Sequence, residues 1–172
     1  MRNLIAIALL GFLFFACHTD QTAALDKHLT ELSASMGAAA ATDRGKAEDF
    51  IKSSEALADL VQKSDPNRYG ELLLKAAGVA KTIEQYDRAI GIYAKILAQA
   101  PQHPKAATAQ FMTGFIYAND LRQLDKAKAA YETFLQQYPK DELAESARME
   151  LANLGKSPEE LIKQFEQQQQ PQ

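Results

Sequence analysis

Apolar residues recur at helical spacing along most of the chain. The first stripe falls at positions i, i+4, i+7 and i+11 and consists of Leu25, Leu29, Leu32 and Met36. From residue 46 onward the same kind of pattern predicts a series of helices, the first from residue 46 to about residue 64 and the others over residues 72–82, 87–99, 104–119, 125–137 and 141–154. Prolines and turn residues separate them, because proline cannot continue a helix. The pattern therefore predicts an all-α fold.

Two helix starts carry capping signals. Asp65 precedes Pro66, and a proline suits the first turn of a helix while an aspartate suits its N-cap. The run Ser157-Pro158-Glu159-Glu160 has the spacing of a capping box, and the apolar residues Leu161, Ile162 and Phe165 follow it. This pattern predicts a short last helix, and the glutamine-rich segment 166–172 predicts a disordered polar tail.

The N-terminal segment 1–16 has the pattern of a targeting signal. Arg2 is its only charge, and Leu4 to Phe15 is an unbroken run of apolar residues and glycine. This run is shorter than the roughly 20 residues that a membrane-spanning helix needs. It fits the apolar core of a secretory signal, so we expect segment 1–16 to be a signal peptide.

Charge and composition exclude several classes of function. The net charge of −3 argues against non-specific binding of nucleic acid. The chain has one cysteine, Cys17, so it can form neither an internal disulfide nor a cysteine zinc site. Its three histidines, His18, His28 and His103, lie far apart and form no two-histidine motif. His103 lies between two prolines, where we expect an exposed, solvated ring.

Nothing in the sequence indicates an active site. We find no metal-ligand motif, no glycine-rich phosphate loop and no base or oxyanion hole for a nucleophilic serine. Paired carboxylates such as Glu159-Glu160 are explained by helix capping and the helix dipole. We therefore expect a protein that is not an enzyme and holds no cofactor and no metal.

The end of the leader resembles the lipobox of bacterial lipoproteins. Phe14-Phe15-Ala16-Cys17 carries the resemblance, with Phe14 where the best-known lipoboxes have leucine. The resemblance implies cleavage between Ala16 and Cys17 and a covalent diacylglycerol and acyl lipid on Cys17. Two or three acyl chains hold a protein on a membrane, whereas one chain binds only marginally. Segment 17–45 would then contain the lipidated cysteine, a polar tether over about positions 18–22 and an N-terminal helix.

Two segments of the chain repeat each other at one fixed spacing. The matched pairs are Ala89 and Ala127, Tyr93 and Tyr131, Ile96 and Phe134, and Pro101 and Pro139. A small residue allows two helices to cross closely, the aromatic and apolar residues fill the space between hairpins, and the proline sets the next turn. A fainter earlier copy contains Ser54, Val61 and Pro66.

These residues resemble the tetratricopeptide repeat. Gly114 and Tyr117 match the family's glycine and tyrosine in the first helix of the second copy, whereas Ala77 and Ala80 depart from them in the first. The spacing of 38 also exceeds the usual length of about 34 residues. The resemblance implies a helical hairpin solenoid of about three repeats over segment 46–165. It is nearest to periplasmic proteins of outer-membrane assembly or Tol–Pal-linked envelope work.

The family binds proteins or peptides in a groove lined by the first helix of each repeat. Carried onto this chain, the resemblance places six candidate partner-binding residues there: Lys75, Lys81, Phe111, Phe115, Asn119 and Met149. The stripe Leu25–Met36 is an alternative occupant of this groove, since it could fold back into it. We expect a lipoprotein of the cell envelope, anchored in the outer membrane and facing the periplasm, that binds an envelope protein or peptide. The alternative is a structural lipoprotein that forms a homo-oligomer.

Overall fold

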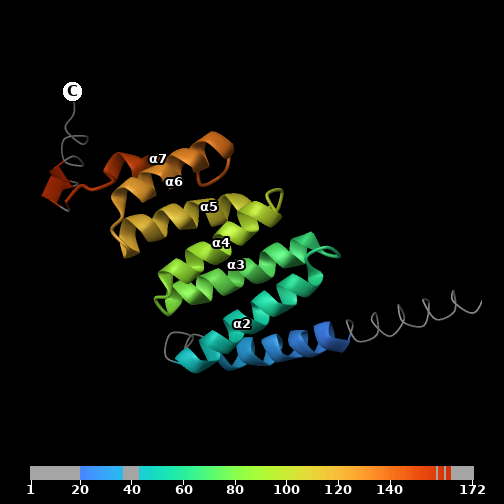
Figure 1. Cartoon of the computed structure of the whole chain (residues 1–172). Coiled ribbons are helices and arrows are strands. Elements are labelled where there is room, and N and C mark those ends of the chain that lie inside the picture. The colour runs from blue at the N-terminus through green and yellow to red at the C-terminus, as the bar shows by residue number, and fades with distance from the viewer. Residues whose placement is uncertain (1–19, 37–42, 158, 161, 164–172) are drawn as a thin grey trace, which may run out of the picture. The chain divides into compact units, whose positions relative to one another are not determined.

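The computed structural model describes residues 20–36, 43–157, 159–160 and 162–163, and the described residues contain helices and no strand (Figure 1). The expected signal peptide, Ala16 and Cys17, the segment 37–42 and the tail 166–172 lie outside the described residues. The chain divides into two compact units, Met1–Ala106 and Ala107–Gln172, called unit 1 and unit 2 below. The fold class is all-α and tetratricopeptide-like, as the sequence predicts.

Unit 1 is built from helix 20–36 and three further helices: α2 (Arg44–Val61), α3 (Pro66–Thr82) and α4 (Tyr86–Gln99). Successive helices run side by side as antiparallel hairpins (Figure 1). The predicted apolar stripes form the core, where Ile51, Leu57, Leu73, Ile92 and Ile96 are almost completely buried.

Helix 20–36 packs against unit 1 through its predicted stripe. Leu29, Leu32 and Met36 are buried, and Leu25 is half-buried. The segment that we expected to form a polar tether overlaps this helix, because positions 20–22 are already helical. Helix 20–36 and α2 together therefore make a hairpin, and its second helix carries Ser54 and Val61 of the fainter predicted repeat copy.

Unit 2 contains nearly all of α5 (Ala106–Phe115), followed by η2 (Ile116–Asp120), α6 (Leu124–Gln137) and α7 (Ala144–Asn153). The sequence predicts one helix over 104–119, but its last turn is a π-helix, η2, closed by a hydrogen bond from Leu121 N–H to the Ile116 carbonyl at 2.9 Å. The hairpin formed by α5, η2 and α6 packs around a core of aromatic side chains. The ring of Phe111 lies 5.5 Å from that of Tyr131 and 5.9 Å from that of Phe134.

The predicted caps are present, with one helix longer than expected. The Asp65 carboxylate accepts the Arg68 backbone N–H at 3.0 Å, and α3 begins at Pro66, well before the predicted start at Leu72. The capping box is also formed, since the Ser157 hydroxyl accepts the Glu160 N–H at 3.2 Å and the Glu160 carboxylate accepts the Ser157 N–H at 2.7 Å.

Candidate functional site

The repeat positions lie where two helices of a hairpin cross. Ala89, Ala127 and Ser54 are completely buried. In unit 2 the two helices cross closely at Gly114, where a Cβ atom would lie 2.8 Å from Cε1 of Tyr131. Any side chain at this position would meet the fully buried tyrosine ring, so the glycine is required by packing.

The larger repeat residues fill the core of each unit. Tyr93 and Ile96 are buried in unit 1, and Tyr131 and Phe134 in unit 2. Burial raises the pKa of Tyr93 to about 12, and burial followed by the charge of Glu150 raises the pKa of Tyr131. These hydroxyls therefore stay neutral at ordinary pH, which is consistent with a packing role.

The remaining repeat residues lie at the margins of the cores. Pro101 and Pro139 are exposed in the turns that follow α4 and α6. Tyr117 is half-buried, and the Lys126 ammonium lies 5.3 Å from the centre of its ring, within the range of a cation–π contact. These residues therefore end and brace the hairpins.

His103 is buried, so the expectation of an exposed, solvated ring is wrong. It is 7% exposed, its Nε2 lies 3.0 Å from the Asn67 carbonyl, and its Nδ1 accepts the Lys105 backbone N–H at 3.1 Å. This pattern requires the tautomer with the proton on Nε2. The ring covers Gly70, where a Cβ atom would lie 2.4 Å from Cδ2 of His103.

His103 occupies the helix-start position of its repeat. Asp65 stands one repeat length before it and Asp141 one repeat length after it, and the Asp141 carboxylate accepts the Leu143 N–H at 2.9 Å. Each of the three side chains thus accepts a backbone N–H at the start of the next helix. The repeat spacing contains this signal, so the capping role of His103 could have been predicted from the sequence.

A chain of ion pairs joins α2 to α4 in unit 1. Arg88 contacts Glu48 at 2.7 Å and Glu55 at 3.0 Å, and Lys95 contacts Glu55 at 2.7 Å. Burial would raise the pKa of Glu55, but the hydrogen bonds from Lys95 and Arg88 outweigh it and lower that pKa. The two carboxylates are satisfied by these cations, so this cluster is a structural brace between two second helices.

Unit 1 has a hollow of about 520 Å³ between helix 20–36 and α3. Its lining includes Thr30, Ser33, Phe50, Leu72 and the predicted partner residue Lys75. Helix 20–36 therefore forms one wall of this hollow. The stripe Leu25–Met36 does not fill this hollow, because it packs into the core and leaves space beside it.

Unit 2 has a hollow of about 410 Å³ between the end of η2 and α7. Two predicted partner residues, Asn119 and Met149, lie in its lining with Asn153, which also belongs to the predicted groove. Met149 is 56% exposed, so its apolar side chain is accessible at this hollow. Arg122 and Lys156 place cations at the same hollow.

The structure does not bring all six predicted partner residues to a surface. Phe111 is only 9% exposed, and its ring packs at a tilt against Tyr131 and edge-to-face against Phe134. Its assignment as a partner residue is therefore corrected to a core residue. Phe115 is half-buried against the core of unit 2. Lys81 is half-buried on α3 and lies outside the linings of the hollows described above.

Among the described residues there is neither a metal-binding cluster nor a membrane-spanning helix. Within residues 20–36, 43–157, 159–160 and 162–163, no group of three or more His, Cys, Asp or Glu side chains is placed to hold a metal ion. Among the same residues, no helix is both long and apolar enough to span a bilayer.

Comparison with known proteins identifies the repeat. A family model of the tetratricopeptide repeat matches residues 108–141, which cover most of α5, all of η2 and α6 and the turn before α7. No curated protein and no solved structure gives a match. The chain therefore contains a tetratricopeptide repeat, and such repeats generally serve protein–protein interaction.

Proposed function

We propose that this chain is a lipid-anchored protein of the cell envelope whose repeats bind a protein or peptide partner. The binding part of the proposal rests on the hollow of unit 2, where the exposed Met149 lies in the lining with Asn119 and Asn153. An amide side chain both donates and accepts hydrogen bonds, as a peptide backbone requires, and methionine adapts to apolar side chains of different shape. This combination suits an extended peptide segment.

The anchoring part of the proposal rests on the lipobox-like run that ends in Cys17. The lipid would be diacylglycerol on the cysteine sulfur with an acyl chain on the new amino group. The residue after the cysteine is His18, and by resemblance to enteric sorting rules it favours the outer membrane, with the repeats facing the periplasm. The protein would then be a tethered adaptor without catalytic activity, cofactor or metal.

Site-specific photo-crosslinking in cells tests the binding site. A photoreactive amino acid is placed at position 149, and in a matched control at position 129, which is exposed on α6 outside the hollow. We expect adducts with an envelope protein from position 149 and few from position 129. Equal labelling from both positions would contradict a binding role for the hollow, and adducts of the chain with itself would favour the structural homo-oligomer.

A Cys17→Ala variant of each crosslinking chain tests the tether. If the lipid brings the repeats to their partner, the adducts from position 149 fade in this variant while the protein is still exported. If the variant remains on the membrane and gives the same adducts, the anchor does not depend on Cys17.

A further inference from the structure

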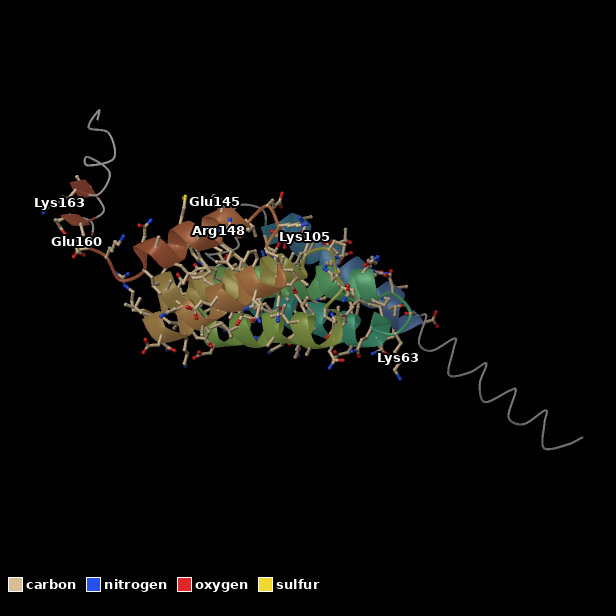
Figure 2. All side chains as sticks on the ribbon, turned by 90° about the horizontal axis from the view of Figure 1, so that it is seen from above. Lys63, Lys105, Glu145, Arg148, Glu160 and Lys163 are labelled. Atoms are coloured by element: carbon tan, nitrogen blue, oxygen red, sulfur yellow. The ribbon has the colours of Figure 1, made fainter. Side chains whose placement is uncertain are left out.

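The start of helix 20–36 lies at one defined end of unit 1. Asp26 forms an ion pair with Arg68, near the beginning of α3, and the turn between α2 and α3 therefore lies beside the first turns of helix 20–36. Figure 2 shows the Lys63 side chain, from this turn, at the same end of unit 1 as the first described turn of helix 20–36. The turn after α4 joins this end, since His103 contacts the Asn67 carbonyl at 3.0 Å.

Helix 20–36 is held on unit 1 by both packing and polar contacts. Leu29, Leu32 and Met36 are buried, at 7%, 9% and 6% exposure. Asp26 pairs with Arg68, and His28 Nε2 lies 3.0 Å from the Asp49 carboxylate. The helix therefore cannot swing away without exposing its apolar stripe, and its direction is fixed relative to unit 1.

The distance from the lipid to this helix is short. The chain between Cys17 and Asp20 reaches at most about 11 Å even when fully extended. From Asp20 to Asp26 the helix rises by about 9 Å. The ion pair with Arg68 thus lies within about 20 Å of the lipid-bearing sulfur.

We infer that the end of unit 1 formed by the turns at residues 62–67 and 100–103 faces the phospholipid headgroups. The inference rests on the proposed lipidation of Cys17. The opposite end, where α2 begins at Arg44, points away, since α2 spans 18 residues and is about 26 Å long. The short reach therefore keeps the first turns of helices 20–36 and α3 nearest to the lipid.

Fluorescence quenching by lipids with a nitroxide on the headgroup tests this orientation. The lipidated protein is purified from membranes and reconstituted in phosphatidylcholine vesicles as a Lys63→Cys variant and as an Arg44→Cys variant. The natural chain has one cysteine, whose sulfur the lipid blocks, so a maleimide dye labels only the introduced thiol. Ser64→Cys is a second variant at the membrane-facing end.

We expect the probes at positions 63 and 64 to be quenched at least twofold more than the probe at position 44. Equal quenching at the two ends, or stronger quenching at position 44, overturns the inference while leaving the anchor intact. The intact mass of each variant is measured first. A mass without lipid, together with failure to bind vesicles, refutes the proposed anchor itself and removes the basis of the inference.

Discussion

The close contact between His103 and Gly70 predicts the effect of a Gly70→Ala substitution on the free energy of unfolding. The sign of this effect should reverse when His103 is removed. A methyl group at position 70 would lie 2.4 Å from Cδ2 of His103, so Gly70→Ala must displace the ring. Displacement breaks the hydrogen bonds to Asn67 and Lys105, and each such bond contributes about 0.5–1.5 kcal/mol. The ring also loses its burial.

Helix propensity opposes this loss, because alanine is better than glycine inside α3 by about 1 kcal/mol. The losses exceed this gain, and we expect Gly70→Ala to lower the free energy of unfolding by about 1–2 kcal/mol. In a His103→Ala background the obstacle is gone, and the same substitution should stabilise by up to about 1 kcal/mol. Gly91→Ala is the matched control, since no atom lies within 4 Å of the added Cβ and the substitution should stabilise in both backgrounds.

Urea unfolding of the chain from position 18 to position 172, followed by circular dichroism, measures the variants of this cycle. The reasoning is refuted if Gly70→Ala destabilises equally with and without His103, because the ring would then not be the group that the methyl meets. It is also refuted if Gly70→Ala stabilises the otherwise natural chain.

Three further predictions concern the same unfolding measurement. Glu84 and Arg122 have φ of 63° and 56°, a left-handed backbone conformation that glycine adopts without strain. A glycine at either position should therefore raise the free energy of unfolding by up to about 1 kcal/mol, whereas an alanine should not. The buried Tyr131 hydroxyl has no hydrogen-bond partner among the described residues. Tyr131→Phe should therefore stabilise the fold by about 1 kcal/mol. A lower free energy of unfolding in this variant would mean that the hydroxyl does have a hydrogen-bond partner. The pKa of Glu55 is lowered from 4.5 in the folded protein. The ionised carboxylate therefore stabilises the fold above pH 4.5, and this stabilisation is lost as the pH falls through the folded-state pKa. Glu55→Gln should therefore make stability less dependent on pH below about 4.5, and an unchanged profile would contradict this.

The helices and repeat positions could be predicted because they depend on local pattern. The period of the apolar residues locates the helices, and the repeat spacing pairs Ala89 with Ala127 and Tyr93 with Tyr131. Each of these four residues is buried at a helix crossing, as the repeat requires. Asp65 was predictable as a cap for the same reason, since its partner lies in the next turn of the chain.

The environment of single side chains was harder to predict because it depends on distant residues. His103 lies in an exposed-looking turn between prolines, yet Gly70, far earlier in the chain on α3, leaves the space that buries it. The helical spacing of Phe111 is compatible with either a groove or a core position. Its contacts with the rings of Tyr131 and Phe134 show that it belongs to the core. The π-turn Ile116–Asp120 has no signature in the helical pattern, since its apolar spacing is that of an α-helix.

The mass of the mature N-terminus tests the central claim most directly. The full chain is expressed in a bacterium with lipoprotein processing, extracted from its membranes and analysed by intact and peptide mass spectrometry. We expect Cys17 to be the first residue and to carry diacylglycerol and an acyl chain, and we expect a Cys17→Ala variant to leave the membrane fraction. A membrane-bound chain with an unmodified Cys17 thiol, or with its first residue elsewhere, would contradict the account.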